Sequence, residues 1–147
     1  MSLTIRVYGI YIEQDRILVT DEFVYGKYVT KFPGGGLQSG EGTIDCLRRE
    51  MIEETQQEVE VLEHYYTTDF FVSSAFDPTR QVISIYYLIK FIEPVKFRIS
   101  EKQFDFPELK DGVQSFRWIK ISELDENSFT LAIDKVVGKM ISKKSGI

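Results

Sequence analysis

The stretch Phe32-Pro-Gly-Gly-Gly-Leu-Gln-Ser-Gly-Glu-Gly-Thr-Ile-Asp-Cys-Leu-Arg-Arg-Glu-Met-Ile-Glu-Glu-Thr55 governs the interpretation of this chain. It begins as a glycine-rich loop and turns at Gly42-Thr43 into a predicted helix that ends at Thr55. Because successive residues of a helix are rotated by about 100°, Glu50, Glu53 and Glu54 share one narrow face. Three carboxylates so close repel one another, and a hard divalent cation, which is bound by oxygen ligands, converts that repulsion into coordination.

The same helix carries an apolar stripe beside its acidic face. Ile44, Leu47 and Met51 recur three and four residues apart, and we expect this stripe to bury against a sheet. Cys46 lies one turn before Glu50. A nucleophilic cysteine needs an activating base, and His64 is the only histidine, so packing is the preferred interpretation of Cys46.

The spacing Gly35-x5-Glu41-x7-Arg49-Glu50-Met51-x-Glu53-Glu54 closely resembles the Nudix box. The family pattern continues with a glycine and then an apolar residue, where this chain has Gln56 and Gln57. The glycine normally closes the helix in a left-handed conformation, which glutamine adopts at a cost of about 1 kcal/mol. Either Gln56 takes that conformation or the helix continues through it.

The resemblance implies a fold, a cofactor and a set of site residues. The fold is α/β, a Nudix-like αβα sandwich with a mixed β-sheet, formed by residues 1–147 as a single domain. The metal is Mg²⁺ or Mn²⁺, and the implied ligands are Glu50, Glu53, Glu54 and the carbonyl of Gly34. Either Glu50 or Glu53 acts as the base on the attacking water, and Arg49 orients a carboxylate.

Several further residues are candidates for the site. Glu41 is expected to brace the glycine loop. Lys31 either contacts a phosphate or is an exposed strand lysine. Because Gly35 has no side chain, its backbone is expected to contact the substrate. A further metal-binding or basic carboxylate is expected among Asp105, Glu108 and Asp111. Stacking of a nucleobase or burial in the core are alternatives for an aromatic group of Tyr65, Tyr66, Phe70, Phe71, Phe76, Phe104 and Phe106.

The rest of the chain predicts the order strands, helix, strands, helix. Strands are expected over 4–12, 16–20, 28–32, 59–72, 81–92 and 114–119. Residues 21–27 are predicted to be a polar connection, and residues 97–112 an excursion that faces the active site. A short turn of helix is expected over 121–125. The closing helix is expected over 128–142, with Phe129, Ile133, Val136 and Met140 on one face.

Length and composition describe the setting of this domain. The 147 residues carry a net charge of −5, which argues against a standing nucleic-acid partner. A single cysteine excludes an internal disulfide and favours a reducing cytoplasm. We see no signal peptide, and no apolar run approaches the roughly 20 residues of a membrane helix. A homodimer is compatible with the sequence.

Together these features predict a metal-dependent pyrophosphohydrolase. Its substrate would be a nucleoside diphosphate linked to another group, such as a nucleotide-sugar, ADP-ribose, an NTP or a dinucleoside polyphosphate. The alternative is a nucleotide-binding sensor module that has a Nudix fold and no turnover. Because all three carboxylates are present, we favour catalysis.

Overall fold

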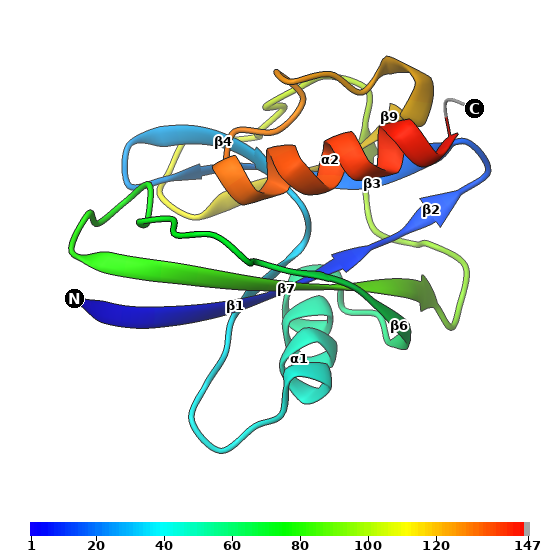
Figure 1. The fold of residues 1–147 in the computed structure, drawn as a ribbon. Coiled ribbons are helices and arrows are strands. Elements are labelled where there is room, and N and C mark those ends of the chain that lie inside the picture. Colours follow the sequence, from blue (N-terminus) through cyan, green and yellow to red (C-terminus); the bar gives the residue numbers. More distant parts are fainter. Residues whose placement is uncertain (146–147) are drawn as a thin grey trace. The chain divides into compact units, whose positions relative to one another are not determined.

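The computed structural model describes residues 1–145, which divide into two compact units. The first unit combines Met1–Tyr11 with Pro33–Phe97, and the second combines Ile12–Phe32 with Arg98–Ile147. Residues 1–145 contain two mixed sheets and two α-helices, so the predicted α/β class is confirmed (Figure 1). Each unit holds one sheet and one helix.

The sheet of the first unit has the strand order β5-β1-β7-β6. β1 (Ser2–Ile10) runs parallel to β7 (Arg80–Phe91), whereas β5 (Gly34–Gly36) and β6 (Val59–Thr67) are antiparallel to their neighbours. The predicted strand 81–92, the longest apolar run of the sequence, forms β7, which lies in the interior of the sheet. β6 ends at Thr67, five residues before the end of the predicted strand 59–72.

Helix α1 spans Thr43–Thr55, the predicted range, and lies against one face of this sheet (Figure 1). Leu47 and Met51 are buried as predicted, together with Cys46 and Thr55. The prediction for Ile44 was wrong, because its side chain is 46% exposed. Ile44 has nearly the same angular position as Met51 but lies in the first turn, before the packed part of the helix.

The ends of α1 differ from those of an ordinary helix. Gly42 is the N-cap residue, and its N–H donates to Asp45 Oδ2 at 3.3 Å. At the other end Gln56 has φ 60° and ψ 24°, a left-handed conformation, and its N–H donates to Ile52 O at 2.8 Å. The helix therefore stops at Gln56, where the family pattern has glycine.

The sheet of the second unit is built around two long strands. β3 (Arg16–Val24) pairs with β9 (Val113–Lys120), and β2 (Ile12–Glu13) and β4 (Lys27–Lys31) also pair with β3. The short β8 (Ile99–Ser100) runs parallel to β9. A 3₁₀ turn, η1 (Ile121–Glu123), and helix α2 (Ala132–Ser145) complete the unit.

Two predictions in this unit need correction. Residues 21–27 are not a polar connection, because β3 continues to Val24 and turns back through Tyr25 and Gly26, with φ 49° and 73°. Two successive positive φ values are typical of a tight hairpin turn, and tyrosine gives little sign of it in the sequence.

The closing helix begins four residues later than predicted. Phe129 precedes α2 and stacks on Phe32, with ring centroids 4.3 Å apart. The buried apolar side chains on the helix are Ile133, Val137 and Ile141, so the predicted stripe through Val136 and Met140 is displaced by one residue. Within residues 1–145 there is no helix long and apolar enough to cross a membrane.

The left-handed conformation of Gln56 predicts the outcome of a single substitution. Gln56→Gly should stabilise the protein by up to about 1 kcal/mol, because glycine adopts a positive φ without a steric penalty. The measurement is the free energy of unfolding in urea. Arg48→Gly, at an exposed helical position, is the matched control and should cost about 1 kcal/mol. A loss of stability in Gln56→Gly similar to that of the control would contradict the left-handed assignment.

Candidate active site

The candidate site is organised around β5, a strand of three glycines. A Cβ atom on Gly34, which has φ 140°, would lie 2.1 Å from the carbonyl oxygen of Val7. A Cβ atom on Gly35 would lie 2.5 Å from the carboxyl carbon of Glu50. Only glycine allows both approaches, so the strand packs against β1 and α1 without side chains of its own.

In this strand the backbone N–H and C=O groups of Gly34 and Gly36 point away from β1. Gly9 N–H donates to Pro33 O, and Leu37 N–H donates to Ile5 O, both at 2.9 Å. Since hydrogen-bonded pairs alternate along an antiparallel ladder, the backbone groups of Gly34 and Gly36 point outward. Accordingly, Gly34 N–H donates to Glu54 Oε2 at 3.2 Å.

Arg49 is the central cation of the acidic face. Its guanidinium donates twice to Glu41, at 2.7 and 3.0 Å, and also to Gly36 O at 3.1 Å. It reaches Glu50 at 3.2 Å and Glu53 at 3.3 Å. The expected pairing of Arg49 with a carboxylate is therefore observed, and it extends to three carboxylates. The positive charge of the guanidinium offsets the repulsion between the glutamates, and the hydrogen bonds from Arg49 to these carboxylates raise the pKa of Arg49.

Glu41 is tied to both the loop and the helix. Its carboxylate accepts from Arg49 and, at 2.8 Å, from the backbone N–H of Gln38. The hydrogen bonds from Arg49, followed by that from Gln38, lower the pKa of Glu41 to about 2. This geometry agrees with the predicted role of bracing the glycine loop.

Cys46 has the environment of a packing residue. Its side chain is buried, and Sγ lies 3.5 Å from Gly36 O and 3.9 Å from Gly35 O. Burial raises the pKa of the thiol to about 11, so the reactive thiolate is disfavoured at neutral pH. The structure gives no support to a nucleophilic role.

The donor atoms on α1 match the chemistry of a hard divalent cation. Glu50 lies against Gly35, Glu54 accepts from Gly34 N–H, and Glu53 follows on the same helix; all three supply carboxylate oxygens, the ligand type that Mg²⁺ prefers. In the observed rotamers Glu50 and Glu53 face Arg49 and Glu54 faces Gly34 N–H. No group of three or more acidic, histidine or cysteine side chains in residues 1–145 is gathered closely enough to hold an ion. Coordination therefore requires these flexible side chains to rotate.

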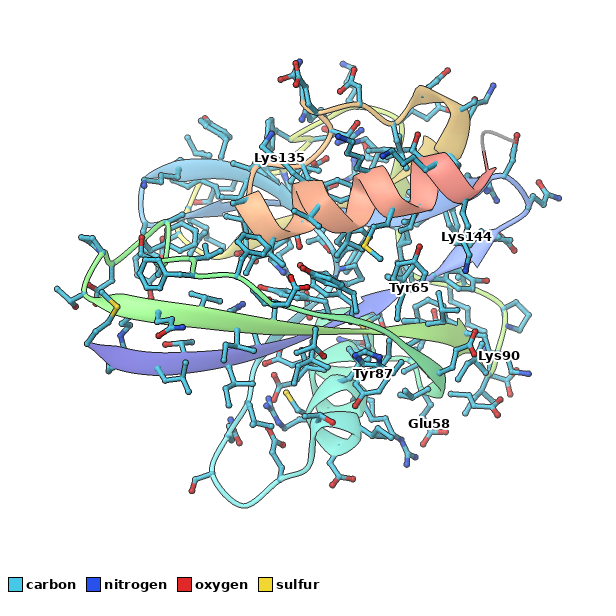
Figure 2. All side chains as sticks on the ribbon, viewed as in Figure 1. Glu58, Tyr65, Tyr87, Lys90, Lys135 and Lys144 are labelled. Atoms are coloured by element: carbon cyan, nitrogen blue, oxygen red, sulfur yellow. The ribbon has the colours of Figure 1, made fainter. Side chains whose placement is uncertain are left out.

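The N-terminus of α1 is joined to β7 through Tyr87. Figure 2 shows Tyr87 close to this helix, and its hydroxyl lies 2.7 Å from Thr43 Oγ1. The Tyr87 ring meets His64 edge-on, with centroids 5.9 Å apart, and His64 Nε2 lies 2.7 Å from Thr67 Oγ1. This chain of contacts fixes the start of the acidic helix on the sheet.

The remaining candidate residues for the site belong to the second unit, whereas α1 belongs to the first. Lys31 is 4% exposed and its Nζ donates to Phe32 O at 3.2 Å, so it is not an exposed strand lysine. Asp105 accepts from Ser100 and Arg98, at 2.6 and 2.7 Å, and these contacts lower its pKa. Asp111 accepts from the backbone N–H of Tyr25, and Glu108 is exposed.

Asp21 and Arg117 form a buried ion pair in this unit that was not predicted from the sequence. Asp21 is fully buried and accepts from Arg117 at 2.8 and 3.0 Å. It also accepts from Thr30 Oγ1 at 2.7 Å and from Phe104 N–H at 3.2 Å. Asp21 thereby anchors the segment of Phe104, whose φ is 54°. The signal in the sequence was an acidic residue within a β-rich run.

The aromatic candidates are divided between the units. Phe104 and Phe106 are neighbours in the second unit, with centroids 6.1 Å apart, and Tyr28 lies 5.1 Å from Phe104. In the first unit Phe70, Phe71 and Phe76 are exposed, whereas Tyr65 and Tyr66 are half-buried. Stacking of a nucleobase on any of them stays a prediction.

The NUDIX domain model matches residues 3–138. Solved structures of similar fold include the E. coli ORF135 protein, with 15% identity, a TM-score of 0.71, and coverage of 99% of this chain and 94% of that one. An ADP-ribose pyrophosphatase from Streptococcus suis has 14% identity and a TM-score of 0.63, with 97% and 91% covered. MutT from Aliivibrio salmonicida and Vibrio cholerae has 21% identity and a TM-score of 0.60, with 97% and 99% covered. No curated protein matches the sequence.

The low pKa of Glu41 predicts how acid destabilises this protein. In the folded state the pKa is about 2, below its usual value of 4.5, so the stabilisation is complete above pH 4.5. It is lost as the pH falls from 4.5 towards 2. Glu41→Gln should therefore be less stable than the wild type at pH 7, and the difference should shrink across this window. Urea unfolding at a series of pH values measures it, and a constant difference would contradict the assignment.

Proposed function

The chain belongs to the NUDIX family, and from this premise we propose that it is a divalent-metal-dependent pyrophosphohydrolase. Its substrate would be a nucleoside diphosphate linked to another group: a nucleotide-sugar, ADP-ribose, an NTP or a dinucleoside polyphosphate. The observation that carries the proposal is the placement of two carboxylates of one helix, Glu50 and Glu54, against a strand of three glycines, with Glu53 on the same helix. One of the similar structures is named as an ADP-ribose pyrophosphatase, which supports a nucleotide substrate.

In the proposed site Glu50, Glu53 and Glu54, together with the carbonyl of Gly34, would hold Mg²⁺ or Mn²⁺. When bound, such an ion would neutralise charge at the phosphate oxygens and lower the pKa of a water molecule. Because Gly34 and Gly35 have no side chains, Glu50 lies directly against β5 and the outward-facing backbone of Gly34 meets Glu54. The proposed metal ligands Glu50 and Glu54 therefore lie next to the backbone of β5.

Arg49 has the role of a positioning residue. Its two hydrogen bonds to Glu41 fix the guanidinium, and its remaining contacts orient Glu50 and Glu53. One of these two glutamates takes the proton from the attacking water. Glu50 has the more enclosed side chain, 17% exposed against 56% for Glu53, but both remain candidates for the base.

Water, rather than a protein nucleophile, is expected to attack phosphorus. Cys46 is the only thiol of the chain, and it is buried with a raised pKa. Hydrolysis would release two phosphate-bearing fragments without a phospho-enzyme intermediate.

We further propose that residues 1–147 act as one domain in a reducing cytoplasm.

A nucleotide-binding sensor is the second candidate function. It is favoured by the pairing of Arg49 with three of the four box glutamates, which balances much of the acidic charge without a metal. A sensor would bind a nucleotide diphosphate tightly and leave it intact.

Hydrolysis in oxygen-18 water tests the proposed reaction. Nucleotide-sugars, ADP-ribose, dinucleoside polyphosphates and NTPs would be incubated with the protein and Mg²⁺, and the products analysed by mass spectrometry. We expect one labelled oxygen on one product phosphate, loss of turnover in excess chelator, and recovery when Mg²⁺ or Mn²⁺ is restored. Turnover that survives exhaustive chelation, or phosphate trapped on the protein, would contradict the mechanism. Tight binding without cleavage would establish the sensor instead.

The carboxylate assignment predicts the behaviour of two conservative variants. Glu53→Gln and Glu54→Gln should each lower kcat by roughly 10²-fold or more, because each removes one charge from the metal site. Their melting temperatures should stay close to that of the wild type. Glu60→Gln, an exposed position on β6, is the matched control and should retain full activity. Normal turnover in both variants at saturating Mg²⁺ would remove the metal assignment.

A further inference from the structure

The two faces of β1 carry different kinds of side chains. Val7 pairs with Gly35, whose missing Cβ would point at Glu50 of α1, so this face is the one that α1 covers. Side chains alternate along a strand, and Arg6 and Tyr8 therefore project from the opposite face. Arg6 pairs with Gly36, and Tyr8 pairs with Gly34. An arginine and a tyrosine thus flank the glycine strand on the face away from the acidic helix.

Arg6 is held in a defined orientation by Tyr8. Arg6 Nε donates to the Tyr8 hydroxyl at 2.6 Å, and the guanidinium carbon lies 5.6 Å from the centre of the Tyr8 ring. Tyr8 is itself 2% exposed, and its ring centroid is 5.4 Å from that of Tyr86 in β7. The flexible arginine is therefore anchored on a rigid aromatic pair, which reduces the entropy it would lose on binding a ligand.

The guanidinium extends over the glycine strand. A Cβ atom on Gly36 would lie 3.8 Å from Arg6 Nη1, in ordinary van der Waals contact. Arg6 and Gly36 form a non-hydrogen-bonded pair, in which cross-strand neighbours approach most closely. Gly35 contacts Glu50, and Gly34 contacts Glu54. A three-residue strand without side chains is consequently flanked by carboxylates on one side and by a guanidinium on the other.

We propose that Arg6 contacts the substrate and binds an oxygen of its diphosphate, at the phosphoryl group next to the one held at the carboxylates. This inference rests on the proposed function and assigns to β1 a role in selecting substrates with two linked phosphates. A diphosphate approaching α1 meets the negative charge of several glutamates, and a fixed positive charge across β5 offsets that repulsion. Guanidinium groups match phosphate geometry with paired N–H donors.

A purely structural role for Arg6 makes a different prediction. If Arg6 only packs on Tyr8, its removal should lower stability and leave ligand affinity unchanged. If it binds the diphosphate, its removal should weaken ligand affinity and raise KM, while kcat changes much less because the carboxylates are intact. The split between KM and kcat therefore separates the two roles.

The test measures both catalysis and equilibrium binding. Binding of α,β-methylene-ADP, a diphosphate analogue that cannot be hydrolysed at its bridging carbon, is measured by calorimetry in Mg²⁺. Arg6→Ala should raise both Kd and KM roughly tenfold or more, the effect of losing a charge-assisted hydrogen bond. Arg6→Lys, which keeps the charge, should recover part of the loss. Tyr8→Phe, which removes only the hydroxyl that orients Arg6, should give a smaller increase in both constants.

Arg48→Ala is the matched control, since Arg48 is an exposed arginine of the same unit on α1. It should leave Kd, KM and kcat unchanged. Melting temperatures identify any variant that fails to fold, and Arg6→Lys then carries the test. Wild-type affinity in Arg6→Ala, or no difference between Arg6→Ala and Arg48→Ala, would overturn the inference while leaving the proposed function intact. Binding of the analogue by a wild-type protein that cleaves nothing would overturn the proposed function alone. A wild-type protein that neither binds the analogue nor cleaves any substrate would overturn both.

Discussion

The close approach of β5 to its neighbours is the constraint on which the candidate site depends. Backbone atoms of Val7 lie where a side chain on Gly34 would begin, and the carboxyl group of Glu50 lies where a side chain on Gly35 would begin. The strand can pair with β1 and still contact α1 only because these positions are glycine. Its outward-facing backbone then meets Glu54 directly. A glycine cluster that resembles a simple turn in the sequence is, in the structure, the surface that receives the acidic helix.

The charge balance of α1 depends on a single arginine. Arg49 contacts Glu41, Glu50 and Glu53, so the negative charges of one helix face and of the loop before it converge on one guanidinium. Glu41 is the firmest of these partners, because it also accepts from the backbone of Gln38. This contact leaves Glu41 engaged in holding the loop, whereas Glu50 and Glu53 make longer contacts with Arg49 and are freer to change partner. Structural and chemical roles are thus divided among carboxylates that look alike in the sequence.

Elements with a strong local signal in the sequence were predicted correctly, and those without one were not. The bounds of α1 and the interior position of β7 were predictable, because helical charge spacing and a long apolar β-rich run are each unambiguous. The hairpin at Tyr25-Gly26 was missed because a tyrosine with positive φ has no local signature. The face of α2 was displaced because Phe129, included in the stripe, packs on Phe32 before the helix starts. The contacts of Arg49 with three carboxylates were only partly predictable, because Arg49 and Glu41 are eight residues apart and Glu41 lies in a loop. Arg6 and Gly36 lie 30 positions apart, and only the strand register brings them together.

The two departures from the family pattern are compensated at the end of α1. Gln56 takes the left-handed conformation expected of glycine, and its N–H closes the last turn on Ile52. Gln57 stands where the family has an apolar residue, but its side chain donates to Pro94 O at 3.0 Å and accepts from Lys96 N–H at 2.7 Å. Its own N–H donates to Thr55 Oγ1, which in turn donates to Met51 O. Hydrogen bonds therefore fix the helix end where the family pattern has an apolar residue. Since Glu54 lies only two residues before Gln56, this arrangement also fixes the position from which the last carboxylate of the face reaches β5.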